Sequence, residues 1–300
     1  MTNELFSGLG YSGYAVVNSV PIPLLPGNAT ENENIIKAGG SYHNNPAFAV
    51  GPLAVKNRRS LPISFATFIC PATMPLVKAL TYAWRTSAAL MDSVGEVPFG
   101  LYPAAGEGYS NVSSGSAYVD DVTLTGAPDA LVTLTINMTC WVWQEVPSQK
   151  ALERDPASKP ILPMSNYYKP IAGWQTRPNF TVMTPNAIPM NWSLTLRNNW
   201  SYQHFLAGYA QPPNPALITA GDLDISFSIA WLAARNNRPL DIGTLQLQIG
   251  VAPGYSPLDV ITIDNLIRDP QRAFTGVAGP NEPIKWEAQY YAQGSIPRSN

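Results

Sequence analysis

The sequence predicts an all-β protein, a sandwich or barrel of short strands, and three observations lead to this fold class. Apolar and polar residues alternate strictly in several segments, a period of two that a helix cannot produce. Proline and glycine separate these segments, with 29 and 22 copies in 300 residues. Helical spacing is scarce. About a dozen short strands divided by such turn residues are typical of sandwiches and barrels.

The clearest alternation lies in the middle of the chain. One face is expected to hold Val132, Leu134, Ile136, Met138, Cys140 and Val142, and the other Thr133, Thr135, Asn137 and Thr139. The same period occurs from Leu223 to Trp231, from Leu245 to Val251 and from Trp192 to Leu196. Strands of parallel sheets read as continuous apolar runs, so these segments predict antiparallel pairing.

Weaker patterns predict eight more strands. They run from Tyr14 to Ile22, Ala47 to Val55, Ile63 to Cys70, Ala117 to Leu124, Phe180 to Met183, Tyr202 to Ala207, Val260 to Ile263 and Ile284 to Tyr291. The best helix candidate runs from Pro75 to Met91, where apolar residues at helical spacing follow a proline suited to a first turn. A second, short helix is predicted from Ser148 to Asp155.

The region from Pro147 to Pro163 differs in composition from its flanks. It gathers charged residues between prolines in a chain that otherwise carries little charge. We therefore predict a jelly-roll-like β domain with an N-terminal arm over residues 1–146, a charged connection over 147–163 and a second β domain over 164–300. A single elaborated jelly roll over 14–300 is the alternative.

The composition limits the partners that the protein can bind. Only 13% of the residues are charged and 45% are hydrophobic, so much of the surface is expected to be covered by neighbouring subunits. The net charge is -2 and Arg58-Arg59 is the longest basic run, so no basic arm for nucleic acid is predicted. We find no targeting segment and no run of transmembrane length, which predicts synthesis in the cytoplasm and no membrane insertion.

The motifs for nucleotide, metal and nucleophilic chemistry are weak. Gly8, Gly10 and Gly13 form a GxGxxG, but almost no strand precedes it and the following residues are rich in proline. His43 and His204 are the only histidines, and neither has a catalytic or metal-binding motif around it. Two cysteines remain, Cys70 and Cys140, which we expect to be buried thiols, with a disulfide or a reactive role as the alternative. No catalytic, cofactor-binding or metal-ligating residue is assigned, and no cofactor is predicted.

Two carboxylate pairs are candidates for acid–base or calcium chemistry. Asp120 and Asp121 are neighbours in a predicted strand, which would place them on opposite faces and prevent them from acting together. Asp222 and Asp224 share one face, opposite the apolar residues of their strand. We interpret that face as solvated, with a divalent ion or a charged contact between subunits as the alternative.

Aromatic residues gather in two segments. Trp141 and Trp143 are expected on the face opposite Val142, which would make the end of that strand apolar on both faces. The second segment holds Trp192, Trp200, Tyr202, Phe205 and Tyr209. Packing in the core or at an interface is its favoured use, and stacking on sugars in a carbohydrate-binding sandwich is the alternative.

Two short segments resemble viral jelly-roll coat proteins, in particular those of picorna-like viruses. ELFSGLGYS at Glu4 to Ser12 is similar to a GLGxS or GFGxS segment near the N-terminus of such subunits, and PLVKALTYAWRTS at Pro75 to Ser87 resembles their helix and following strand. Picorna-like subunits are cut from a polyprotein, whereas this chain begins with Met1, and its charged middle suits one barrel poorly. Coat proteins of membrane-containing DNA viruses, with one or two jelly rolls, are similar in architecture.

Both resemblances imply the same function. They imply a structural capsid protein of an icosahedral virus that lies in the virion and assembles with other capsid subunits, as a homo-oligomer or also a hetero-oligomer. The alternative is a β-sandwich carbohydrate- or receptor-binding module, such as a lectin or a phage receptor-binding protein. A hydrolase on a β scaffold ranks third, because no carboxylate pair can be placed for it.

Overall fold

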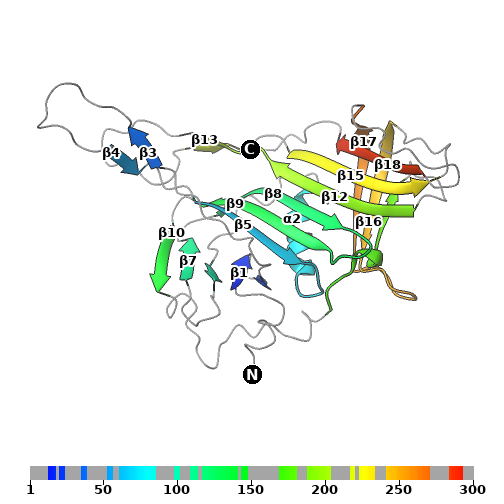
Figure 1. The fold of residues 1–300 in the computed structure, drawn as a ribbon, viewed down its shortest axis with the longest axis horizontal. Helices are drawn as coiled ribbons and strands as arrows, with labels where there is room; N and C mark the ends of the chain where they lie inside the picture. The colour runs from blue at the N-terminus through cyan, green and yellow to red at the C-terminus, as the bar shows by residue number, and fades with distance from the viewer. Residues whose placement is uncertain are drawn as a thin grey trace, which may run out of the picture.

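The computed structural model confirms an all-β fold with one described α-helix, α2 (Figure 1). It describes residues 13–17, 20–23, 35–38, 53–56, 61–85, 98–101, 109–113, 117–140, 143–147, 169–180, 188–203, 217–219, 223–233, 241–270 and 284–292. The strands of the N-terminal half are β1 (Gly13–Val17), β2 (Val20–Pro23), β3 (Ile35–Ala38), β4 (Leu53–Lys56), β5 (Leu61–Phe68), β6 (Pro98–Leu101), β7 (Tyr109–Ser113), β8 (Ala117–Gly126), β9 (Thr133–Cys140) and β10 (Trp143–Pro147). The strands of the C-terminal half are β11 (Thr176–Phe180), β12 (Ile188–Asn198), β13 (Ser201–Gln203), β14 (Leu217–Thr219), β15 (Leu223–Ala233), β16 (Ile242–Ile249), β17 (Asp259–Arg268) and β18 (Ile284–Ala292).

A nine-stranded antiparallel sheet dominates the fold. Its strand order is β11-β16-β17-β18-β15-β12-β8-β9-β5, and all of its neighbouring strands pair antiparallel, as the alternation predicts. β8 from the N-terminal half pairs with β12 from the C-terminal half. A division into residues 1–146 and 164–300 therefore cuts through this sheet. The described residues fix this order, and a jelly-roll order stays a prediction.

Three smaller sheets account for the remaining strands. The five-stranded sheet has the order β10-β7-β6-β1-β2, and β13 pairs with β14 and β3 with β4. The strand predicted from Tyr14 to Ile22 is in fact a hairpin, because β1 and β2 pair with each other. The strand predicted to continue to Val142 is also corrected. β9 ends at Cys140, and Trp143 begins β10 in the five-stranded sheet, so Trp143 does not make β9 apolar on both faces.

Most of the other predicted strands lie where the alternation places them, in β5, β8, β12, β15, β16, β17 and β18. β11 is an exception, because it ends at Phe180, the residue at which the prediction began. β4 and β13 overlap their predicted segments only in part. Several of the predicted features lie outside the described residues: the helix from Ser148 to Asp155, both histidines, Asp222, Phe205, Tyr209, Trp141, Gly8 and Gly10.

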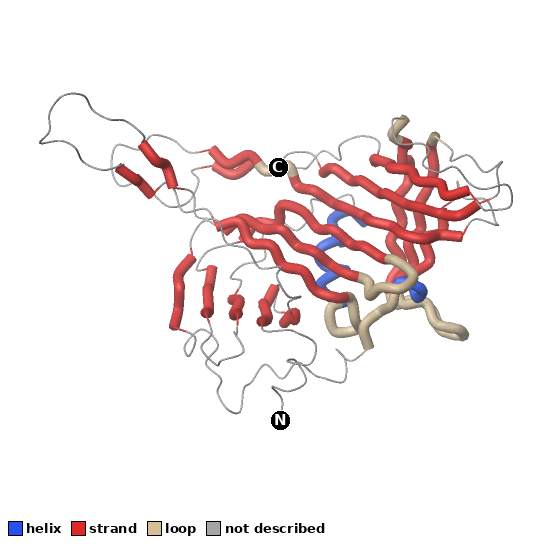
Figure 2. The backbone as a smooth tube through the Cα atoms, viewed as in Figure 1, coloured by secondary structure: helices blue, strands red, loops and turns tan. Residues whose placement is uncertain are grey.

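The helix α2 (Met74–Arg85) lies on the core side of the large sheet, where it contacts β17. Pro75 occupies the first turn, where a missing N–H costs nothing. Leu76, Val77 and Leu80 are fully buried and belong to one hydrophobic cluster with residues of both halves of the chain. Figures 1 and 2 show that β16 and β17 run steeply across the direction of β8 and β12, so the sheet bends around this core.

One end of the sheet is closed by backbone hydrogen bonds among three segments. The N–H of Ile69 donates to the carbonyl of Val132, that of Val132 to Ile171, and that of Ile171 to Ile69, each at 2.8 Å. Gly173, in the short 3-10 helix η2 (Gly173–Gln175), donates to the carbonyl of Ala130 at 2.8 Å. A Cβ at Gly173 would lie 1.8 Å from the Ala127 carbonyl oxygen, so only glycine permits this approach.

Candidate functional site

A β-bulge in β8 creates the most elaborate polar cluster in the described structure. Val119 pairs with Met138 and Asp121 with Asn137, which leaves Asp120 as the extra residue without a cross-strand partner. The bulge shifts the alternation by one residue, and buried positions change from 117 and 119 to 122 and 124. Asp120 and Asp121 therefore both lie on the face away from the core. The prediction that they lie on opposite faces is wrong.

Each of the two carboxylates accepts a hydrogen bond from β9. Thr139 Oγ1 donates to Oδ2 of Asp120 at 2.7 Å, and Asn137 Nδ2 donates to Oδ1 of Asp121 at 2.7 Å. The Tyr202 hydroxyl, from β13, donates to Oδ1 of Asp120 at 3.2 Å. Both oxygens of Asp120 are thus engaged, by one donor from β9 and one from β13.

The turn after β12 is attached to the same bulge. Asn198 Nδ2 and Trp200 Nε1 both donate to the carbonyl oxygen of Val119, at 2.7 and 2.8 Å. A carbonyl oxygen has two lone pairs, so it can accept both. The Tyr118 ring meets the rings of Trp200 and Tyr202 edge to face, with centroids 5.7 and 6.4 Å apart. We name Tyr118, Asp120, Thr139, Trp200 and Tyr202 the bulge cluster.

Burial controls the ionisation of this cluster. Desolvation raises the pKa of Asp120, and the charge of Asp121 adds to the rise, while the hydrogen bonds from Thr139 and Tyr202 act in the opposite direction. The pKa of Tyr202 is also raised, first by desolvation and then by the charge of Asp120. Tyr202 therefore remains a hydrogen-bond donor at neutral pH. The arrangement can hold a proton or bind a polar ligand beside aromatic rings, but it does not pair a nucleophile with a base.

Hydroxyl groups line the outer face of the large sheet over β9, β8, β12 and β15. Eight Thr and Ser side chains lie in two cross-strand rows over β9, β8, β12 and β15, which we name the hydroxyl face: Thr135, Thr123, Thr195 and Ser226 in one row, and Thr133, Thr125, Ser193 and Ser228 in the other. Thr123 hydrogen-bonds to Thr195 at 3.1 Å, and Thr125 to Thr133. No member of either row is charged.

A charged row borders the hydroxyl face on the side of the bulge. Asp121 on β8, Arg197 on β12 and Asp224 on β15 are cross-strand neighbours. Asp224 is exposed, as predicted for a solvated face, and accepts a hydrogen bond from Asn199 Nδ2 at 2.7 Å. Its predicted companion Asp222 lies outside the described residues. In the described part of the chain, no group of three or more His, Cys, Asp or Glu side chains could hold a metal ion.

The structure separates the aromatic residues that the sequence grouped together. Trp200 and Tyr202 join the bulge cluster, whereas Trp192 is a core residue, 4% exposed, whose Nε1 donates to Thr176 Oγ1 at 2.9 Å. Tyr118 completes the cluster, and sequence analysis did not find it. Cys70 is a buried free thiol as expected.

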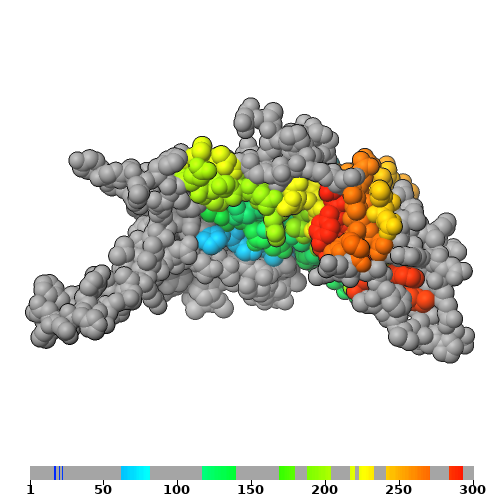
Figure 3. Space-filling model, turned by 90° about the horizontal axis from the view of Figure 1, so that it is seen from above, coloured from blue at the N-terminus to red at the C-terminus, as the bar shows by residue number. Residues whose placement is uncertain are grey.

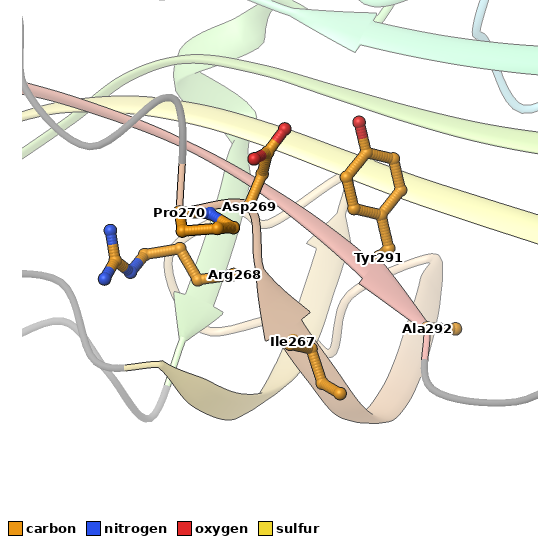
Figure 4. Close-up of a pocket in the computed structure, with 6 residues that line it drawn as sticks. All are labelled: Ile267, Arg268, Asp269, Pro270, Tyr291 and Ala292. Atoms are coloured by element: carbon orange, nitrogen blue, oxygen red, sulfur yellow. The ribbon is translucent and has the colours of Figure 1, made fainter.

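An open pocket of about 470 Å³ lies at the far end of β17, where this strand meets β18. It is lined by Ile267, Arg268, Asp269, Pro270, Tyr291 and Ala292 (Figure 4). The side chains of Asp269 and Tyr291 point to the same side, and Arg268 points away from them. Arg268 is buried and donates through Nε to Oδ1 of Asp241 at 3.0 Å. The Arg268 guanidinium is thus used to hold the start of β16 against the end of β17.

No protein-family model matches the chain, and no curated protein matches it. No described helix is long and apolar enough to cross a membrane.

Proposed function

We propose that this chain is a structural subunit that assembles with copies of itself into a particle, the shell of an icosahedral virus. The observation that carries this proposal is the hydroxyl face. It covers four neighbouring strands, roughly 15–20 Å at the usual strand spacing, and consists of short uncharged side chains, two pairs of which hydrogen-bond to each other.

Such a surface suits contact between subunits for a physical reason. Covering a charged surface requires the desolvation of ions, which costs several kcal/mol per ion unless each is well paired. Hydroxyl groups exchange water for a neighbouring hydroxyl at low cost because each can donate and accept. The low overall charge of the chain, 13% of its residues, favours the same interpretation.

Sedimentation velocity of the full chain over a concentration series tests this proposal. We expect large particles above a threshold concentration, and only a weak effect of NaCl between 50 and 500 mM (roughly a threefold change in Debye length), because the contacts involve few exposed charges. Thr195→Lys places a charge in the middle of the hydroxyl face and is expected to abolish assembly. Thr262→Lys, at an exposed position of β17, is the matched control. A chain that remains monomeric throughout contradicts the proposal.

The bulge cluster supports a second candidate function, the binding of carbohydrate. Three aromatic rings beside a carboxylate are a common way to stack and hydrogen-bond a sugar, and Tyr118, Trp200 and Tyr202 lie beside Asp120 in this manner. A glycan array probed with wild type and with Trp200→Ala tests it. Binding that the substitution abolishes supports this candidate, and an array without signal contradicts it.

A further inference from the structure

A short segment after β12 is fastened to the bulge in β8 by its side chains. Trp200 Nε1 donates to the Val119 carbonyl at 2.8 Å, and the Tyr202 hydroxyl donates to Oδ1 of Asp120 at 3.2 Å. Asn198, the last residue of β12, donates to the same Val119 carbonyl at 2.7 Å. We name residues 199–203, the turn and β13, the docked segment. Two consecutive residues of β8 therefore form its attachment point.

The docked segment lies at the molecular surface. Ser201 and Gln203 are exposed, whereas Trp200 and Tyr202 are half-buried and meet the ring of Tyr118 edge to face. Figure 3 shows the yellow-green residues of β12 and β13 at the surface, beside the green residues of β8 and β9. A short surface segment held by a small number of contacts can open locally while the core of the sheet stays folded.

Asp120 is the ionisable acceptor at this attachment point. Its Oδ1 accepts from Tyr202 and its Oδ2 from Thr139, at 3.2 and 2.7 Å. The Thr139 hydroxyl can also accept a hydrogen bond, so a protonated Asp120 keeps a partner on each oxygen by donating to Thr139. Protonation therefore leaves the contact between the docked segment and the bulge intact.

The groups around Asp120 do not balance its charge. β9 presents Thr139 and β13 presents Tyr202, and both are uncharged at neutral pH. Asp121, the next residue of β8, adds a like charge. The cation of the adjacent strand β12, Arg197, is the cross-strand partner of Asp121, and β14, which pairs with β13, has no charged residue. In the described part of the chain, an ionised Asp120 thus faces hydroxyl donors and a second carboxylate.

Docking and proton binding at Asp120 are therefore linked. While the segment is docked, desolvation raises the pKa of Asp120 above its ordinary value. When the segment opens, water reaches the carboxyl group and its pKa returns toward about 3.9. The docked state thus binds the proton more tightly than the open state. Docking is strongest below the ordinary pKa and weakens as the pH rises through the pKa of the docked state.

We propose that the docked segment is an acid-stabilised latch, which stays closed on the bulge while Asp120 is protonated and opens more often once Asp120 is ionised. Opening separates the rings of Trp200 and Tyr202 from Tyr118 and uncovers the Val119 carbonyl, and so changes the surface that borders the charged row. The movement takes place within one chain. The latch is therefore independent of both candidate functions.

Hydrogen exchange of the full chain, followed by mass spectrometry between about pH 4 and 7.5, tests the latch. Peptides that cover the docked segment report its opening equilibrium, after each exchange rate is divided by the intrinsic chemical rate at that pH. We expect the opening constant to increase with pH, by at most about tenfold for each unit by which docking raises the pKa of Asp120.

Asp120→Asn provides the variant that cannot titrate. The Asn amide has the shape of a protonated carboxyl group, and it can donate to Thr139 and accept from Tyr202. Its opening constant is expected to stay low and to be independent of pH. Asp264→Asn is the matched control, because Asp264 is exposed on β17, and it is expected to keep the pH dependence of the wild type.

Trp200→Phe tests the same latch without a change at Asp120. It removes the hydrogen bond to the Val119 carbonyl and keeps an aromatic ring beside Tyr118. We expect a larger opening constant at every pH, with the same increase between low and high pH as in the wild type. This variant keeps the test decisive if Asp120→Asn does not fold, which circular dichroism melting checks for all variants.

Peptides from β15 distinguish local opening from unfolding of the whole chain. β15 lies inside the large sheet and carries core residues, so its amides are expected to exchange far more slowly than those of the docked segment at every pH. Equal opening constants for the docked segment and β15 would contradict a local latch. A wild-type opening constant that does not change with pH, or an increase that persists in Asp120→Asn, would overturn the role of Asp120.

Discussion

Tyr202 donates its hydroxyl proton to Oδ1 of Asp120 at 3.2 Å, and this bond joins two strands that are 82 residues apart in the chain. The bulge in β8 makes it possible, because the extra residue turns the carboxylate of Asp120 toward Thr139 and β13. The bond has consequences for the dependence of stability on pH, which follow from the direction of the pKa shift.

The pKa of Asp120 in the folded protein is raised above its ordinary value, chiefly by desolvation. The folded state therefore binds the proton more tightly than the unfolded state does. The stability that this carboxyl group contributes is present below its unfolded pKa of about 3.9 and is lost as the pH rises through the folded pKa. We expect Asp120→Asn to remove this dependence, so that the variant gains in free energy of unfolding relative to wild type between pH 3.5 and 7. Urea unfolding at each pH measures it.

Tyr202→Phe tests how the hydrogen bond from Tyr202 affects the pKa of the Asp120 carboxyl group. It removes a hydrogen bond that lowers the pKa of Asp120, so the loss of stability is expected to extend to higher pH than in the wild type. An NMR titration of the Asp120 carboxyl carbon in both proteins measures the pKa directly. A lower pKa in Tyr202→Phe than in wild type would contradict the role assigned to this hydrogen bond.

Thr67 is a buried threonine whose hydroxyl group has no hydrogen-bond partner among the described residues. Ile63 and Phe65 share the core face of β5 with it, and both are buried. Thr67→Val replaces the hydroxyl with a methyl of similar size and is expected to raise the free energy of unfolding by about 1 kcal/mol. Thermal and urea unfolding measure the change.

Thr73 is the matched control for this substitution. It is equally buried, but its Oγ1 accepts a hydrogen bond from the Cys70 N–H at 2.9 Å and lies within hydrogen-bond distance of the Phe68 carbonyl. Thr73→Val removes the acceptor of the Cys70 N–H and is expected to lower the free energy of unfolding by about 1–3 kcal/mol. Equal changes in the free energy of unfolding for Thr67→Val and Thr73→Val would contradict the role assigned to these hydrogen bonds.

Gly126 and Trp192 are close neighbours in the core. A Cβ on Gly126 would lie 2.6 Å from the indole ring, and the ring is held by its hydrogen bond to Thr176. Gly126→Ala is therefore expected to lower the free energy of unfolding by about 1–3 kcal/mol through overpacking. In a Trp192→Leu background the same substitution is expected to cost less, and a double-mutant cycle measures the coupling.

The strand prediction succeeds where one face of the sheet is buried along the whole strand. In β15, Leu223, Ile225, Phe227 and Ile229 are buried, and the residues between them lie on the outer face. Burial of one face imposes the period of two, so the strand can be predicted from the alternation in the sequence. The same holds for β9 and β16.

The bulge in β8 was missed although the sequence contains its signal. Val119 and Val122 are both apolar and three residues apart, which breaks the period of two and places one extra residue between them. Reading this shift would have placed Asp120 and Asp121 on one face. Tyr118 could not have been assigned to the cluster in this way, because its contacts depend on the turn that carries Trp200 back over β8.

The separation of Trp143 from β9 has a different cause. The alternation continues past Cys140, so local pattern predicts one strand, whereas tertiary pairing with β7 places β10 in another sheet. The positions of the exposed apolar residues were not predicted either. An exposed and a buried apolar residue look alike in sequence, and only the packing distinguishes Tyr255 from Tyr290.

Electron microscopy of the purified full chain, at concentrations above the assembly threshold, tests the central claim most directly. The account predicts closed particles of uniform diameter built from repeated copies of this chain. Open tubes or isolated rings would support self-assembly of the chain but would contradict an icosahedral shell. A field that contains only monomers at every concentration and salt would contradict the structural role itself.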